Sequence, residues 1–236
     1  MEQLTPYLPK IVEGYLTTVR IAILSILLAA VVAGVLGSMR VARPRVLRLS
    51  SGAGLELLRG TSVIVQLFWV YYALPLLPGN LAVDPVVAAT LVLGLNGGAY
   101  GAETVRSGLR SIPKAQHDAC HALGLPGWVA LLRVRLPQAL SQIVPAFGSI
   151  AVDMVKWTSI VSFVTVQDLL YWGNTARAHT GQTISVYLLV SALYLLLCVA
   201  VAGIFRAIEY VLPMTRSVRA ARVRVVPTPA PVGGGR

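Results

Sequence analysis

The chain contains 236 residues, of which 56% are hydrophobic and only 12% are charged. This balance excludes an ordinary soluble domain and indicates an integral membrane protein. The formal net charge of +11 would also suit a nucleic-acid-binding protein, but 16 of the 20 Lys and Arg residues lie in three short segments beside apolar runs. The positive-inside rule of membrane topology explains that distribution better. The two cysteines, Cys120 and Cys198, provide no disulfide framework.

The apolar runs predict an all-α membrane fold with five transmembrane helices. The expected spans are residues 16–39, 55–77, 85–107, 141–164 and 183–211. The first run is long enough to cross about 30 Å of hydrocarbon at about 1.5 Å per residue. Asn96-Gly97-Gly98 lies in the middle of the third run, where small residues are expected to allow close contact between helices.

The fourth span depends on charge, because Gln142, Asp153 and Lys156 make it weakly apolar. Without a crossing there, the basic residues from Arg206 onward would lie outside the cell while the other two basic segments lie inside. With a crossing, all three segments share the cytoplasm. We therefore expect the N-terminus outside the cell and the C-terminus in the cytoplasm.

A polar, basic island, residues 103–137, separates the third and fourth spans. Within it, Ser111-Ile112-Pro113 is typical of a helix start, because Pro is tolerated in a first turn. Gly124 can adopt the left-handed backbone that ends a helix, and Pro126 cannot continue it. The sequence therefore predicts a short amphipathic helix over residues 112–124, which we interpret as a cytoplasmic docking element.

A metal site in this island is the competing interpretation. His117, Asp118, Cys120 and His121 lie within little more than one helical turn, and His residues four apart can share a metal ion. A complete site needs a third or fourth ligand from elsewhere, and the remaining histidine, His179, is expected on the opposite side of the membrane. We therefore prefer a solvated docking face and predict no metal ligands.

The domain organisation is expected to be simple. Residues 1–215 are predicted to form one transmembrane domain, and residues 216–236, rich in Arg, Pro and Gly, a disordered basic cytoplasmic tail. None of the three lysines follows a glycine, which excludes a G-x-x-x-x-G-K-[ST] phosphate-binding loop. The outward loops, each under about 20 residues, are too short for a binding domain.

Four segments carry a resemblance to a known family. They are ELLRGTSVIVQLFWVYYALP at 56–75, GAYGAETVRSGLRSIPKAQHDACHALGL at 98–125, RLPQAL at 135–140 and KWTSIVSFV at 156–164. Together they resemble the membrane (permease) subunits of ATP-binding cassette (ABC) importers of the polar amino acid uptake family. The likeness covers roughly residues 11–212, nearly everything except the tail.

The resemblance implies a function and a set of partners. Such a subunit forms the translocation path for a polar amino acid or related small solute in the bacterial cell (inner) membrane. It is not an enzyme and binds no cofactor, because ATP and Mg are held by a separate ATPase subunit. A second permease chain, identical or related, and an extracytoplasmic substrate-binding protein complete the transporter. An ATP-independent channel or secondary transporter is the alternative, but it would leave the docking island unexplained.

The resemblance also assigns roles to residues of the island. In this family the loop between the third and fourth spans contains a Glu-Ala-Ala triplet, whose short helix fits a cleft on the ATPase. Asp118, Ala119 and Cys120 occupy the triplet, and Gly124 matches the family glycine six residues after its acid. Leu123 lies on the same predicted helix. Asp in place of Glu and Cys in place of Ala are departures from the family pattern.

Asp153 and Lys156 are the charged pair of the fourth span. Three residues apart on a helix, they can share a face and neutralise each other. An unpaired charge at the bilayer centre costs at least about 2.5 to 3.5 kcal/mol, so we expect both to point into the bundle interior. Two interpretations stay open: a locked ion pair, or a substrate path lined by Asp153 and Lys156 with Thr158 and Ser159 as polar contacts.

Overall fold

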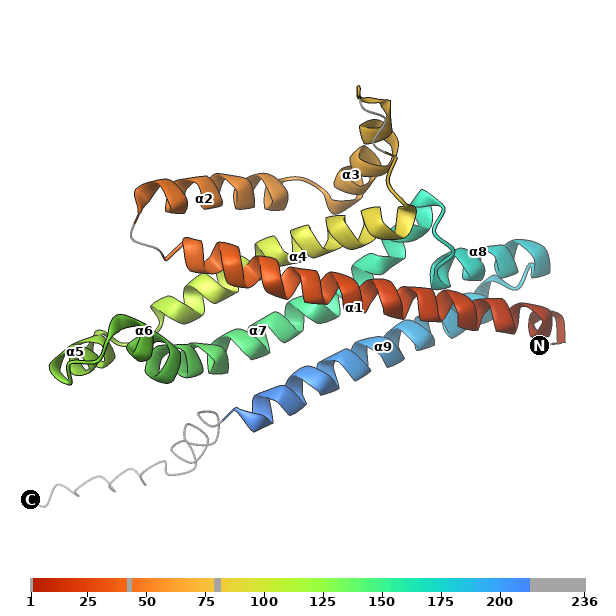
Figure 1. Cartoon of the computed structure of the whole chain (residues 1–236). Coiled ribbons are helices and arrows are strands. Elements are labelled where there is room, and N and C mark those ends of the chain that lie inside the picture. The colour runs from red at the N-terminus through yellow and green to blue at the C-terminus, as the bar shows by residue number, and fades with distance from the viewer. Residues whose placement is uncertain (1, 42–43, 79–81, 213–236) are drawn as a thin grey trace, which may run out of the picture.

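The computed structural model describes residues 2–41, 44–78 and 82–212, without the side chains of residues 2–4 and 117. Every element in this part of the chain is helical (Figure 1). Four helical segments are long and apolar enough to cross a membrane, and one sharply bent helix pair raises the number to five. The four are Thr5–Met39, Pro85–Arg110, Gly127–Val164 and Thr183–Val211. The predicted all-α membrane fold is therefore confirmed.

The core of the bundle is a pair of long helices packed along their length. They are α1 (Leu8–Met39) and α4 (Pro85–Arg110), with α7 (Leu136–Trp157) and α9 (Thr183–Val211) beside them. The expected close contact at Gly97 and Gly98 is present. A Cβ atom at Gly98 would lie 2.6 Å from Val32 of α1, and one at Gly97 would overlap the sulfur of Met154 in α7. Glycine at these positions lets α4 sit in the middle of the bundle.

The predicted second span is wrong as a continuous helix. Residues 55–77 are divided between α2 (Arg45–Gly60) and a stalk of three short helices, α3 (Val63–Phe68), η2 (Trp69–Ala73) and η3 (Leu74–Leu76). The two parts meet at 97°, so the stalk projects away from the bundle (Figure 1). The bend lies at Thr61 and Ser62, whose backbones are extended.

Polar side chains stabilise this bend. The amide of Gln66 donates hydrogen bonds to the Leu58 carbonyl (2.8 Å) and the Thr61 hydroxyl (2.6 Å). The amide of Asn96, from α4, donates to the same Leu58 carbonyl at 3.0 Å and to the Gln66 side-chain oxygen at 3.2 Å. The Leu58 carbonyl near the end of α2 thus has hydrogen-bond donors although no further helical turn follows. A backbone carbonyl in apolar surroundings needs such a donor.

The island between the third and fourth spans holds α5 (Lys114–Ala122), followed by α6 (Gly127–Val129) and η4 (Ala130–Arg135). The predicted helix start is two residues early, because Pro113 occupies the N-cap position and helical geometry begins at Lys114. The fourth span also begins before the predicted residue 141. Its helix runs from α6 through α7 and continues as η5 (Thr158–Val164), giving the candidate span Gly127–Val164.

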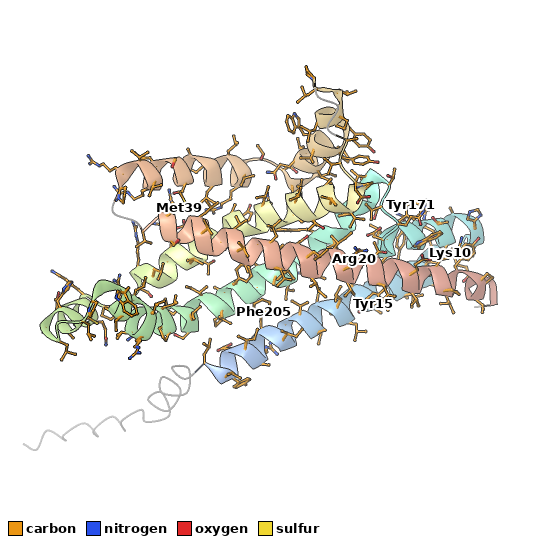
Figure 2. All side chains as sticks on the ribbon, viewed as in Figure 1. Lys10, Tyr15, Arg20, Met39, Tyr171 and Phe205 are labelled. Carbon is orange, nitrogen blue, oxygen red and sulfur yellow. The ribbon has the colours of Figure 1, made fainter. Side chains whose placement is uncertain are left out.

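One end of the bundle is basic, because it holds Arg40 at the C-cap of α1, Arg110 in the last turn of α4, and Arg133 and Arg135 of η4. At this end lie α5, α6 and the C-terminal ends of α1, α4 and α9 (Figure 1). Met39 marks this end of α1, and Lys10 marks the other (Figure 2). The opposite end holds η1 (Glu2–Tyr7) and α8 (Leu169–Thr180), where Tyr7 stacks on His179 at 5.9 Å between ring centroids. The predicted tail, residues 216–236, lies outside the described residues.

Candidate coupling and translocation sites

The C-terminal end of α5 is built around Gly124. Its φ of +65° is the left-handed conformation expected from the sequence. The amide of Leu125 donates to the Cys120 carbonyl and that of Gly124 to the His121 carbonyl, both at 3.0 Å. These two bonds form the Schellman arrangement that satisfies the last carbonyls of a helix. Gly124 therefore ends α5 and turns the chain toward α6.

The residues assigned to coupling divide into two faces of α5. Asp118 and Ala119 are exposed, and so is Leu123, with 75% of its surface accessible. Cys120 is buried, with 6% accessible, and so cannot itself touch a docking partner. Trp128 of α6, 67% exposed, adds a large apolar side chain to this end of the bundle. Trp128 was not predicted as a site residue, although a tryptophan within a polar segment favours a contact surface.

Two contacts attach α5 to the transmembrane helices. Ile112, just before α5, is buried in a cluster with Ala139 and Ile143 of α7. The Gln138 side chain of α7 donates a hydrogen bond of 3.4 Å to the Gln116 side chain of α5. These contacts connect α5 and the residue just before it to α7.

The metal interpretation gains no support from the described residues. No group of three His, Cys, Asp or Glu side chains lies close enough together to hold an ion in that part of the chain. The side chain of His117 lies outside it. His179 lies beside Tyr7, at the end of the bundle opposite to α5 (Figure 1).

Asp153 and Lys156 form the expected ion pair, with 2.9 Å between Oδ1 and Nζ. The expectation that they point into the bundle is wrong for this chain, because their side chains are 54% and 61% exposed, respectively. The opposite face of α7, with Ala151, Met154 and Val155, is fully buried and leaves the pair on the outside.

The two hydroxyls assigned to the path are held by their own helix. Thr158 is buried and donates to the Val155 carbonyl at 2.7 Å. Ser159 is half-buried and donates to the Lys156 carbonyl at 2.8 Å. Of the four predicted path residues, Asp153 and Lys156 thus present exposed charged groups.

A polar cavity of about 440 Å³ lies between α4 and α7. Its polar lining residues are Arg59, Tyr100, Glu103, Thr104, Ser107 and Gln142. This site was not predicted from the sequence. The signal was present on α4, where the four lining residues Tyr100, Glu103, Thr104 and Ser107 recur at i, i+3, i+4 and i+7 and so share one face.

Charged groups of both signs reach this cavity. The guanidinium carbon of Arg59 lies 5.0 Å from the centre of the Tyr100 ring, a cation–π contact. Glu103 accepts two hydrogen bonds from Nε of Arg106, at 2.8 and 3.0 Å. On α7, Gln142 lines the cavity and Asp153 follows on nearly the same helical face, eleven residues further along. The cavity and the ion pair therefore lie along one side of α7.

Comparison with known proteins decides the family. Residues 30–210 match the family described as the binding-protein-dependent transport system inner membrane component. The chain belongs to this family. Curated relatives of this permease include a probable amino-acid ABC transporter permease protein of Sinorhizobium fredii, 34% identical, with 86% of this chain and 87% of the relative covered. The glutamine transport system permease protein of Escherichia coli is 30% identical, with 86% and 93% covered.

Further matches agree. The L-cystine transport system permease protein of Bacillus subtilis is 32% identical, with 87% of this chain and 85% of the relative covered. A crystal structure of an amino acid ABC transporter with histidines shares the fold, with a TM-score of 0.79, 24% identity, and 88% of this chain and 96% of that chain covered. The MetNI methionine ABC transporter in an inward-facing conformation shares it with a TM-score of 0.68 and 22% identity, with 88% and 98% covered. The expectation of an ABC importer permease is confirmed.

Proposed function

We propose that this permease forms half of the translocation path for a polar amino acid or related small solute. The observation that carries the proposal is the cavity between α4 and α7, which Arg59 and the Arg106-paired carboxylate of Glu103 line with charged groups inside a membrane domain. Charged side chains within membrane segments mark substrate pathways. A zwitterionic substrate has a carboxylate for the arginine and an ammonium group for an acid. Relatives that carry amino acids, glutamine or cystine support this class.

Two such chains would enclose the path between them. The stalk formed by α3, η2 and η3 exposes Phe68, Trp69, Tyr72 and Leu76. A second permease chain, identical or related, would cover these apolar groups. Asp153 and Lys156, exposed in the single chain, would then line the shared interface with Thr158 and Ser159 behind them.

ATP hydrolysis on a partner ATPase would drive alternating access. We assign α5 as the coupling helix, with Asp118, Ala119, Leu123 and Gly124 at the ATPase surface and Cys120 supporting them from behind. The ATPase holds ATP and Mg, and this chain supplies no catalytic group. The basic end of the bundle then faces the cytoplasm and the N-terminus lies outside, where an extracytoplasmic binding protein delivers substrate. Residues 1–215 act as one transmembrane domain.

The proposed contact between Asp153 and the substrate is tested by Asp153→Asn, which keeps the side-chain shape and removes its charge. Hydrogen bonds to charged groups contribute about 1.5 to 3 kcal/mol, so uptake of a cationic substrate should fall about 10- to 100-fold relative to a neutral one. Competition between cationic and neutral amino acids, measured with the complete transporter in vesicles, gives this ratio. Ser141→Ala, on the same helix, is the matched control.

Two other outcomes would contradict a substrate role for Asp153. An unchanged substrate preference combined with poor assembly, rescued when Lys156→Gln is added, would establish a locked ion pair and refute the substrate role. Normal preference and normal assembly in Asp153→Asn would refute both interpretations.

A further inference from the structure

A second cavity, of about 740 Å³, opens at the basic end of the bundle between the ends of α1 and α4 and the start of α2. Five arginines line it: Arg40, Arg45, Arg48, Arg106 and Arg110. A single acid, Glu56, is among the described lining residues. The cavity is therefore strongly positive, and it is separate from the polar cavity between α4 and α7.

Helices fix the positions of these arginines. The lining residues of α2 run from Arg45 to Glu56 at i, i+3, i+4, i+7, i+8 and i+11, so they form one face of that helix. Arg106 and Arg110 are one turn apart on α4 and form the facing wall. Arg40 follows the last turn of α1 and closes the cavity between them.

The positive charge is only partly compensated within the chain. Arg106 is bonded to Glu103, and Arg40 lies 4.0 Å from the same carboxylate. Nε of Arg40 is buried and has no hydrogen-bond partner among the described residues. Arg45 and Arg48 are exposed. Because a buried guanidinium donor without a partner is costly, the cavity is suited to an external anion.

We propose that this cavity binds the headgroup of an anionic phospholipid of the cytoplasmic leaflet. Arginine matches phosphate through parallel N–H···O bonds. The cavity lies where transmembrane helices end, the level of the headgroups, and basic pockets between helices on that side suit cardiolipin-type lipids. Leu49, 69% exposed, lines it too, and Val46 beside it is 77% exposed. These apolar groups fit acyl chains and have no role toward a soluble anion.

This inference uses the orientation proposed above but not the substrate or the coupling helix. It is tested by native mass spectrometry of the complete transporter taken from phosphatidylcholine vesicles with and without cardiolipin. In Arg45→Gln/Arg48→Gln, cardiolipin affinity should fall roughly 30-fold, the conversion of about 1 kcal/mol per basic residue. Arg133→Gln/Arg206→Gln, which removes one charge from η4 and one from the C-terminal part of α9, both outside the cavity, should retain the lipid.

Arg45→Lys/Arg48→Lys keeps the charge and should retain more cardiolipin than the glutamine variant, which separates loss of binding from loss of folding. Equal retention by the two glutamine variants would overturn the proposal. Equal retention of cardiolipin and phosphatidylcholine by the unmodified transporter would also overturn it. Displacement of cardiolipin by an equal concentration of inorganic phosphate would assign the cavity to a soluble anion instead.

Discussion

Asp168 joins three helical segments, α8, η5 and α9, at the end of the bundle opposite to α5. It is fully buried, and it caps α8 by accepting a hydrogen bond from the Tyr171 amide at 2.9 Å. The same oxygen accepts from the Ser162 hydroxyl of η5 at 2.7 Å, and the other accepts from the Tyr194 hydroxyl of α9 at 3.4 Å. Next to it, the Leu169 amide donates to Thr18 of α1 at 3.1 Å.

Burial raises the pKa of the Asp168 carboxyl above its ordinary value of 3.8, although the bonds from Tyr171 and Ser162 act in the other direction. A raised folded-state pKa means that the folded protein holds the proton more firmly than the unfolded chain does. The stabilising contribution is therefore complete below pH 3.8 and is lost as the pH rises through the folded-state value.

Two replacements of Asp168 should distinguish the effect of its charge on stability from the effect of its hydrogen bonds. Asp168→Asn keeps a capping oxygen and removes the buried charge, so its free energy of unfolding at neutral pH should equal or exceed that of the unmodified protein. Asp168→Ala should lose about 1–3 kcal/mol, because the hydroxyls of Ser162 and Tyr194 lose their acceptor. Thermal unfolding in detergent across a pH series measures both. Equal destabilisation by Asn and Ala at neutral pH would contradict this account.

For single residues, the sequence predicts backbone conformation better than it predicts whether a side chain points into the bundle or away from it. Gly124 adopts the expected left-handed conformation, because the end of a helix depends on the residues next to it in the sequence. Asp153 and Lys156 pair as expected, since their spacing alone brings them together. Their exposure could not be predicted, because it depends on which face of α7 the other helices cover. The cavity near Glu103 was missed because its walls come from separate helices.

At the scale of elements, the bent second span shows how an apolar run can mislead. Hydropathy treats residues 55–77 as continuous, but Gly60, Thr61 and Ser62 favour a helix end over a helix interior. The decisive contacts come from Gln66 and Asn96, which satisfy the Leu58 carbonyl. Asn96 is 30 residues from Gln66, so their meeting required the fold.

The proposed role of α5 as the coupling helix can be tested through Gly124, the residue that ends it. Apart from Gly124 and its two chain neighbours, no described residue has a heavy atom within 4 Å of a Cβ placed on Gly124, so a larger side chain there meets backbone strain and not a clash. Gly124→Val should cost about 1–3 kcal/mol of local stability, because a β-branched residue avoids positive φ. We expect transport to fall while the ATPase detaches or hydrolyses ATP without regard to substrate. Uptake and substrate-stimulated ATPase activity of the reconstituted transporter measure this uncoupling.

Gly127→Val is the matched control for that variant. Gly127 lies three residues away in equally open space, but its φ is outside the left-handed range. Gly124→Asn provides a second control, because Asn tolerates the left-handed region. Substrate-stimulated transport at the normal rate in Gly124→Val would refute the assignment of α5 as the transmission element. Equal losses in Gly124→Val and Gly127→Val would show that the left-handed conformation is not the cause.

At the scale of the whole molecule, the distribution of basic residues predicts how many times the chain crosses the membrane, which hydropathy alone does not decide. The weakly apolar fourth span was inferred because only a crossing there places all three basic segments on one side. In the structure, Arg40, Arg110 and Arg206 lie on helices whose C-terminal ends gather at the same end of the bundle. The third and fifth spans, predicted over residues 85–107 and 183–211, agree closely with the helices Pro85–Arg110 and Thr183–Val211. The first span begins earlier than expected, because residues 8–15 continue its helix although their polar groups weaken the signal.

Topology follows from this charge asymmetry and can be measured on intact cells. In a background carrying Cys120→Ala and Cys198→Ala, single cysteines at Ala82 and His179 should react with a membrane-impermeant maleimide, because both lie at the end proposed to be external. Cysteines at Lys114 and Arg133 should react only after the cells are opened. All four positions are exposed in the chain, so a lack of labelling reports membrane side and not burial. Protection of His179→Cys in intact cells, with labelling of Ala82→Cys, would remove the fourth crossing. The reverse pattern at all four positions would invert the proposed orientation and place α5 out of reach of a cytoplasmic ATPase.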